Sequence, residues 1–252
     1  MEGIAITAFL FVAGLLIGSF LTVVAHRVPR GESVVGGRSH CPACGARIAA
    51  YDNVPVLSWL LLRGRGRCCG TAISSRYPLT ELALGMLYAA TGLAFRDDAV
   101  QLLLGLVFVS MLVAVTLTDL ERRIIPNKVL LVAAALAIAI VAVGAPDSLP
   151  ERALAALAAG GLLLAAALAY PSGMGLGDVK LAATMGLFLG RDVAPAILVA
   201  LLAGSLVGVA MIAREGVAAR KRAIPFGPFL ALGGLVGLFA GDEMVEWYLG
   251  IF

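Results

Sequence analysis

Long runs of apolar residues, separated by short polar segments, are the main pattern of this chain. The runs at 129–143 and 153–170 nearly or fully reach the roughly 20 residues that a helix needs to cross the hydrocarbon core of a bilayer. Backbone groups in lipid have no water to bond, so the spanning segments are expected to be helices. With breaks at Pro, Gly and charge clusters, the pattern predicts eight transmembrane helices, at 4–26, 78–95, 99–118, 129–144, 152–170, 174–190, 194–213 and 226–241.

Composition supports this interpretation and excludes a soluble globular domain. The chain has 252 residues, of which 61% are hydrophobic and 14% charged, and its mean hydropathy is +0.99. Soluble domains are about half apolar and about a quarter charged. The start, Met-Glu-Gly, lacks the basic segment of a secretory signal peptide, so the first apolar run is expected to be a retained helix. We therefore predict an all-α, polytopic membrane protein.

The basic residues indicate the orientation, because Lys and Arg accumulate in cytoplasmic loops. With the N-terminus outside, 16 of the 19 Lys and Arg fall on the inner side, and the exceptions are Arg96, Arg152 and Arg191. The inner set is Arg27, Arg30, Arg38, Arg47, Arg63, Arg65, Arg67, Arg76, Arg122, Arg123, Lys128, Lys180, Arg214, Arg220, Lys221 and Arg222. We therefore expect a multi-pass protein of the inner (plasma) membrane, organised as a first helix (1–26), a cytoplasmic basic loop (27–77) and a seven-helix core (78–252).

Two aspartates fall at the cytoplasmic boundary of this predicted core. Asp119 ends the third helix and Asp178 lies in the glycine-rich start of the sixth. An acid near hydrocarbon costs about 2.5–3.5 kcal/mol at a helix centre and less toward the interface, so it is by default a functional candidate. Two carboxyls a few ångströms apart share one proton, and such a pair can activate water and polarise a carbonyl without a metal. Other aspartates lie in or beside outer loops, where solvation is expected: Asp97, Asp98, Asp147, Asp192 and Asp242.

The residues before Asp178 read Gly-Met-Gly-Leu-Gly at 173–177. Gly175 and Gly177 have no β-carbon, which permits unusual backbone dihedrals and lets another helix or an extended substrate approach closely. Access of the substrate backbone to the acid and plain helix packing are therefore two alternative interpretations of this motif.

The loop at 27–77 contains all four cysteines of the chain. Disulfides are disfavoured on the cytoplasmic side, so metal binding is the better interpretation, and reduced thiols without a metal are the alternative. The spacing of Cys41-Pro-Ala-Cys44 lets both thiolates face one tetrahedral, structural zinc ion. Cys68 and Cys69 are adjacent and are expected to point in different directions, which makes the second half unusual. The candidate ligands are Cys41, Cys44 and Cys69, completed by Cys68 or His40.

The basic loop also suits contact with anionic membrane lipids. Its aromatic residues Tyr51 and Trp59 lie beside apolar stretches that favour membrane docking, so we expect no nucleic-acid partner.

Several further motifs follow one another along the chain. They are Gly18-Ser-Phe-Leu-Thr-Val-Val24 with His26-Arg-Val-Pro-Arg30, Cys41-Pro-Ala-Cys44, Tyr51-Asp-Asn-Val-Pro-Val-Leu-Ser-Trp59, Arg76-Tyr-Pro-Leu-Thr-Glu-Leu82, Asp119 with Pro126 and Asn127, Gly175-Leu-Gly-Asp-Val-Lys180, and Ile224-Pro-Phe-Gly-Pro228. In this series the chain closely resembles the bacterial type IV prepilin leader peptidase/N-methyltransferase family, over nearly its whole length.

The resemblance implies that Asp119 and Asp178 are the catalytic pair of a GxGD-type aspartyl protease. It implies prepilin and pseudopilin substrates of type IV pili or type II secretion, whose short basic leader is cut after a glycine at the cytoplasmic boundary. It also implies methylation of the new N-terminal amine with S-adenosylmethionine as donor, an activity that the family associates with the cysteine loop. No donor pocket is identifiable in the sequence, so the cofactor-binding residues are unknown.

The chain departs from the family pattern at one place. The second cysteine pair is usually Cys-x-x-Cys, whereas the matching stretch here reads Gly66-Arg67-Cys68-Cys69. This substitution leaves the fourth metal ligand open.

Two other classes of function compete with the protease. Paired acids and broken glycine-rich helices also serve proton-coupled transporters, but those have acids near the membrane midplane and internal repeats, which this sequence does not show. A non-catalytic assembly factor that binds pilin-like helices is the second alternative, and replacement of Asp178 by Asn distinguishes it from an enzyme.

Overall fold

The computed structural model describes residues 2–34, 40–41, 43–170, 173–216 and 224–251, and in these ranges the chain is helical. The described part contains no β-strand, and its extended pairing consists of two isolated bridges, His40 with Arg47 and Arg65 with Ala72. The predicted all-α fold class is confirmed.

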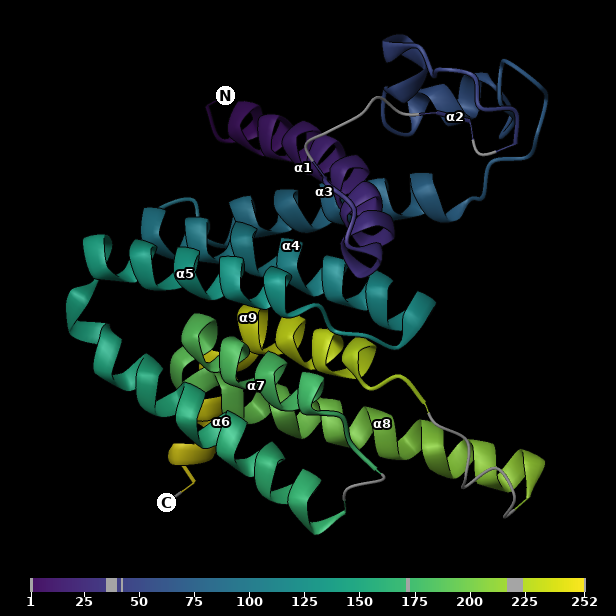
Figure 1. The fold of residues 1–252 in the computed structure, drawn as a ribbon. Helices are drawn as coiled ribbons and strands as arrows, with labels where there is room; N and C mark the ends of the chain where they lie inside the picture. Colours follow the sequence, from purple (N-terminus) through teal and green to yellow (C-terminus); the bar gives the residue numbers. More distant parts are fainter. Residues whose placement is uncertain (1, 35–39, 42, 171–172, 217–223, 252) are drawn as a thin grey trace. The chain divides into compact units, whose positions relative to one another are not determined.

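Each of the eight predicted helices has a counterpart (Figure 1). They are α1 (Glu2–Arg27), α3 (Arg76–Ala94), α4 (Ala99–Arg122), α5 (Asn127–Gly144), α6 (Leu149–Ala169), α7 (Leu176–Leu189), α8 (Val193–Glu215) and α9 (Gly227–Leu249). The loop adds the short helix α2 (Leu57–Leu61) and the turns η1 (Val28–Arg30) and η2 (Ala50–Asn53), and the turns η3 (Pro146–Ser148) and η4 (Gly190–Asp192) precede α6 and α8.

The helix ends differ most at α9, where the sequence predicted an end at residue 241. The helix continues to Leu249 through Asp242, Glu243 and Glu246. The predicted end rested on these charges, which interrupt an apolar run but do not break a helix outside the hydrocarbon.

Six stretches of the described chain are long and apolar enough to cross a membrane. One of them, Leu176–Glu215, contains both α7 and α8, and α3 is not in the set. Helix α7 has only 14 residues, which makes it the shortest of the eight predicted helices. The chain is a multi-pass membrane protein, and the predicted number of eight spans is approximate.

The chain forms two compact units, Met1–Asp98 and Ala99–Phe252. In the first, α1 packs along α3, and the loop that joins these helices carries α2 and the cysteines. The predicted division into 1–26, 27–77 and 78–252 stays a prediction.

The second unit packs α4 to α9 around one apolar core. Helix α6 lies along α7, α8 along α9, and α4 contacts both α5 and α9 (Figure 1). Phe108 of α4 is fully buried and stacks on Phe188 of α7 with ring centroids 5.0 Å apart. This packing fixes the relative positions of α4, α7 and α9, which carry the residues of the candidate site described next.

Four basic residues of the predicted inner set cannot be compared with the structure, and one predicted loop acid differs from expectation. Arg38, Arg220, Lys221 and Arg222 lie outside the described residues. Asp192 was expected to be a solvated loop acid, but it is half-buried and its Oδ1 is shielded from solvent.

Candidate functional site

Asp119 and Asp178 line the same cavity in the second unit. Its volume is about 250 Å³. The end of α4 and the first turn of α7 supply the two acids, and both side chains are largely buried. The complete lining is Asp119, Arg123, Ile124, Ile125, Asn127, Gly175, Gly177, Asp178 and Lys180. The structure therefore brings together two acids that are far apart in the sequence, with Gly175 and Gly177 beside them.

The carboxylate of Asp119 accepts a backbone hydrogen bond from another helix. The N–H of Gly227, the first residue of α9, donates to Asp119 Oδ2 over 2.8 Å. A β-carbon at Gly227 would lie 2.7 Å from the same oxygen. Only a glycine permits this close approach without displacing the acid.

Asp178 is held from within its own helix terminus. The N–H of Gly175 donates to Asp178 Oδ2 over 3.2 Å, and the N–H of Asp178 donates to the carbonyl of Gly175 over 3.1 Å. A β-carbon at Gly177 would lie 3.1 Å from Cβ of Ile125. Gly177 thus has a packing role beside the α4–α5 connection, while Gly175 borders the acid itself.

Two cations complete the cavity wall. Arg123, directly after α4, has a left-handed conformation with φ 55°, and its N–H donates to the carbonyl of Asp119 over 2.8 Å. The Nζ of Lys180 donates to Asn127 Oδ1 over 3.1 Å, which ties the start of α7 to the start of α5. From the sequence, Arg123 had only a topological interpretation, and Lys180 was noted besides only as the last residue of the motif Gly175-Leu-Gly-Asp-Val-Lys180.

The four cysteines of the first unit lie in two turns of the loop that are closed by the same type of hydrogen bond. In the first, the N–H of Gly45 donates to the carbonyl of Cys41 over 2.8 Å. In the second, the N–H of Gly70 donates to the carbonyl of Gly66 over the same distance. Both closing glycines have a positive φ, 71° and 70°, which explains why glycine is needed there. The bridges His40–Arg47 and Arg65–Ala72 flank the two turns at equivalent places.

This repeat explains the departure at Gly66. Gly66 takes the position of Cys41, and Cys69 takes the position of Cys44. A β-carbon at Gly66 would lie 3.9 Å from Cys68 Sγ, so the thiol of Cys68 occupies the space next to the missing side chain. The expectation that adjacent cysteines point apart is wrong, because the tight turn directs both thiols to the same side.

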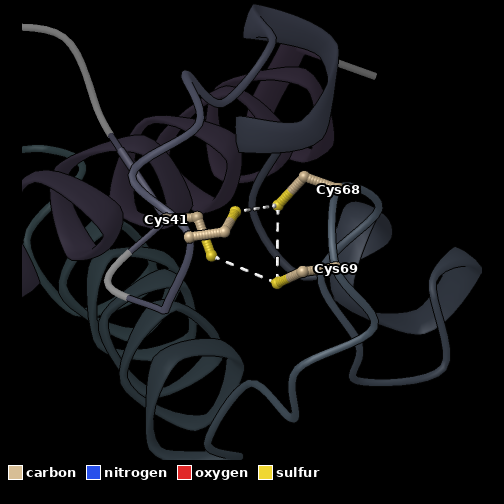
Figure 2. Close-up of side chains that lie close together, drawn as sticks. Cys41, Cys68 and Cys69 are labelled. Atoms are coloured by element: carbon tan, nitrogen blue, oxygen red, sulfur yellow. Dashed lines mark hydrogen bonds between the residues drawn. The ribbon is translucent and has the colours of Figure 1, made fainter.

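Figure 2 shows the thiols of Cys41, Cys68 and Cys69 turned towards one another. The separation of the sulfurs is 3.6 Å for Cys41 and Cys69, 3.4 Å for Cys44 and Cys68, and 3.8 Å for Cys68 and Cys69. All four sulfurs lie within 4.8 Å of one another. Tetrahedral zinc with bonds of about 2.3 Å places its sulfurs about 3.8 Å apart, so the four cysteines fit the ion. His40 is not part of this group.

The thiols differ in acidity. Hydrogen bonds from Thr71 lower the pKa of Cys69 to about 6, and backbone hydrogen bonds from Cys44 and Ala43 lower the pKa of Cys41. The hydrogen bond with Cys44 raises the pKa of Cys68 to about 12. A bound metal ion would deprotonate all four thiols, as thiolate ligation requires.

The segment 51–59 contacts both the second turn, at Arg67, and helix α3, at Glu81. Arg67 makes a bidentate ion pair with Asp52 at 2.9 and 3.0 Å. The N–H of Val56 donates to Oε2 of Glu81 in α3 over 2.7 Å. Glu81 is buried, with 7% of its surface exposed. Trp59 donates its Nε1–H to the carbonyl of Ile73 over 3.0 Å, so this ring also supports the loop, and its predicted contact with the membrane stays a prediction.

Comparison with known proteins identifies the family of the chain. Two family models match the chain, "Bacterial Peptidase A24 N-terminal domain" over residues 12–95 and "Type IV leader peptidase family" over residues 106–213. A prepilin leader peptidase/N-methyltransferase from Bacillus subtilis (strain 168) is 34% identical, with 96% of this chain and 97% of that protein covered. The chain belongs to the prepilin leader peptidase/N-methyltransferase family. The resemblance inferred from the sequence is confirmed.

Other members of the prepilin peptidase family show similar coverage. The protein of the same description from Aeromonas hydrophila is 33% identical, over 97% of this chain and 94% of its own length. That from Stutzerimonas stutzeri is 35% identical, over 94% and 92% respectively. No solved structure matches the chain.

The family ranges divide the two sites cleanly. The cysteine cluster lies in the N-terminal range, and Asp119 and Asp178 lie in the peptidase range. Gly227 lies beyond both ranges, and no role was predicted for it from the sequence. The motif Ile224-Pro-Phe-Gly-Pro228, which contributes to the family resemblance, was the signal that could have found it.

Proposed function

We propose that this protein is an aspartic endopeptidase that removes the leader of prepilin-like precursors and methylates the new N-terminus. One observation carries the peptidase: Asp119 of α4 and Asp178 of α7 line one cavity together with Gly175. Family membership supports the substrate class, because the relatives are named as leader peptidases and N-methyltransferases of prepilins.

The two acids suit hydrolysis without a metal ion. The ionised carboxylate takes a proton from water as the water oxygen attacks the scissile carbonyl carbon. The protonated carboxyl donates to the carbonyl oxygen, and the tetrahedral intermediate then collapses with rupture of the C–N bond and protonation of the leaving amine. Gly175, next to Asp178, leaves room for an extended substrate backbone.

We place the cavity at the cytoplasmic face of the inner membrane, with the N-terminus of the chain outside. Arg122, Arg123, Lys128 and Lys180 cluster around the ends of the helices that carry the acids, in line with the preference of cations for the cytoplasmic side. This face also receives the basic leader of a precursor whose hydrophobic helix lies in the membrane.

The test uses the purified full chain and a recombinant precursor with a short basic leader that ends in glycine before a hydrophobic helix. Asp119→Asn and Asp178→Asn should each lower the cleavage rate by at least about a thousandfold, as for loss of a catalytic group elsewhere. Each asparagine keeps an oxygen that can accept the glycine N–H, so both variants should fold. Normal cleavage by either variant would exclude the aspartyl mechanism and favour the scaffold.

The methyl transfer belongs to the first unit in our proposal, with S-adenosylmethionine as the donor. The four cysteines would hold a structural zinc ion, which would cross-link the two turns and supply no chemistry to cleavage. Mass measurement of the mature product after incubation with S-adenosylmethionine decides the second activity. An increase of one methyl group at the N-terminal amine is expected, and an unmodified amine would restrict the protein to cleavage.

A further inference from the structure

The contact between α9 and Asp119 suggests a division of roles between the two acids. Helix α9 begins at Gly227, and its N-cap, Phe226, provides no side-chain hydrogen bond to the helix. The carboxylate of Asp119, which comes from α4, accepts the N–H of Gly227 instead. Asp119 therefore caps a helix distant in sequence, and the residue after Gly227 is Pro228, which has no N–H to offer.

The position of this helix start is fixed by packing. A β-carbon at Gly204 of α8 would lie 3.1 Å from the ring of Phe226, and Phe226 lies beside Phe229 with ring centroids 6.2 Å apart. The start of α9 is thus held against α8, and the N–H of Gly227 is held against Asp119. A preorganised donor of this kind does not need to reorient when the charge of its acceptor changes.

Asp178 lies in the first turn of α7, whereas Asp119 lies both beside the first residue of α9 and in the last turn of α4, so the helix termini do not assign the ionised form to Asp119. The hydrogen bonds do, because the bond to Asp119 is 2.8 Å long and the bond to Asp178 is 3.2 Å long. Arg123, which follows α4, lines the same cavity as Asp119. The other cation that lines the cavity, Lys180, donates to Asn127. Helix α9 adds no charge at its N-terminal end, because its first charged residue is Asp242.

We propose that Gly227 is a positioning residue of the peptidase: its N–H holds Asp119 in the ionised form, so that Asp119 takes the proton from water and Asp178 donates to the carbonyl. The proposal rests on the proposed peptidase function and assigns the two roles within it. Gly227 acts through Asp119, and the bare α-carbon keeps the donor in hydrogen-bond reach of the carboxylate.

Gly227→Ala tests this assignment, because its β-carbon would press on the Asp119 carboxylate. The cleavage rate of the precursor at its optimum should fall at least about tenfold. The acidic limb of its pH profile should move up by about one pH unit, since the ionised form loses part of a charge-assisted hydrogen bond. The matched control is Gly234→Ala in the same helix, where the β-carbon meets side chains of Leu112, Phe108 and Met185 at 3.1–3.2 Å, away from the acids. Its acidic limb should stay at the wild-type pH.

An acidic limb that does not move in Gly227→Ala, or that moves equally in Gly234→Ala, would overturn the proposal. If Gly227→Ala does not fold, Gly204→Ala decides, because it displaces Phe226 and with it the start of α9. A smaller shift in the same direction is expected, and no shift would overturn the proposal. Wild-type and Asp119→Asn proteins in the same assay show separately whether cleavage depends on Asp119 at all.

Discussion

Cys68 lies next to Cys69, in a turn whose counterpart carries cysteines at its first and fourth positions. Both turns are closed by the same hydrogen bond to a glycine with positive φ, and the sulfur of Cys68 lies near the missing side chain of Gly66. Sulfur position, and not sequence spacing, therefore determines whether a metal can bind. This is a property of single residues, and it can be tested by moving one thiol.

Moving the thiol should preserve the metal site. We expect both the wild type and Gly66→Cys combined with Cys68→Ser to bind one zinc ion per chain, because the double variant restores the pattern of the first turn. Cys69→Ser, which removes a ligand and offers no substitute, should lower the zinc content of the purified protein to well below one. The measurement is the metal-to-protein ratio by mass spectrometry. Full zinc in Cys69→Ser would show that the ion binds elsewhere or that three thiolates suffice.

The position of Asp178 depends on how α7 packs against α6. A β-carbon at Gly160 of α6 would lie 2.9 Å from Cβ of Ala183 of α7, whereas one at the neighbouring Gly161 would meet nothing within 4 Å. Gly160 therefore lies in close contact with α7, whereas Gly161 faces open space. Close contact of small residues is the usual way in which helices associate in lipid.

Gly160 and Gly161 provide a matched test of the packing between α6 and α7. Gly160→Leu should push α7 away from α6, lower the stability by about 1–3 kcal/mol and reduce precursor cleavage, because Asp178 moves with its helix. Gly161→Leu adds the same side chain and should leave both quantities near the wild-type value. Thermal unfolding in detergent and the cleavage assay measure the two effects. Equal behaviour of the two variants would contradict the observed packing.

A hydrogen bond joins helix α3 to a strained turn of the loop at Val56. Val56 has φ 62° and ψ −52°, and the N–H of Leu57 donates to the carbonyl of Pro55 over 2.6 Å, which is a strained γ-turn for a β-branched residue. Glu81 holds this turn through the N–H of Val56. Such strain persists only where the surroundings enforce it.

Removal of the acceptor should release the turn. Glu81→Ala is expected to destabilise the first unit by about 1–3 kcal/mol, since it leaves a hydrogen-bond donor without its partner. Glu81→Gln keeps an accepting oxygen and should stay close to the wild type. Limited proteolysis of the full chain reports the change as faster cutting within residues 51–63. Slow cutting in Glu81→Ala would show that the turn does not need Glu81.

For the whole molecule, the sequence predicted what depends on local composition. Apolar runs located every long helix, and the charge at the ends of α4 and α7 identified Asp119 and Asp178. What it could not predict depends on contacts between distant residues. The hydrogen bond between Gly227 and Asp119 joins positions that no periodicity relates, and the convergence of Cys68 and Cys69 follows from a turn geometry that spacing rules do not describe.

The two units suggest that the two activities can be separated. Cys41→Ser with Cys44→Ser removes half of the metal site from the first unit, while both acids belong to the second. In the proposed scheme this variant loses methylation of the product, and its cleavage rate stays within about threefold of the wild type, because the zinc supplies no chemistry to hydrolysis. Mass measurement of the product gives both quantities together. Loss of cleavage would mean that the first unit is required for hydrolysis as well.

The brevity of α7 has a consequence for the supply of water. Its 14 residues extend over about 21 Å, against a hydrocarbon thickness of about 30 Å. Either the bilayer thins around this helix, or one of its ends lies below the level of the headgroups. Where the bilayer thins, or where the submerged end is the one that carries Asp178, the cavity beside Asp178 brings solvent to a depth that a full-length helix would keep dry, and this supplies the water for hydrolysis within a lipid environment.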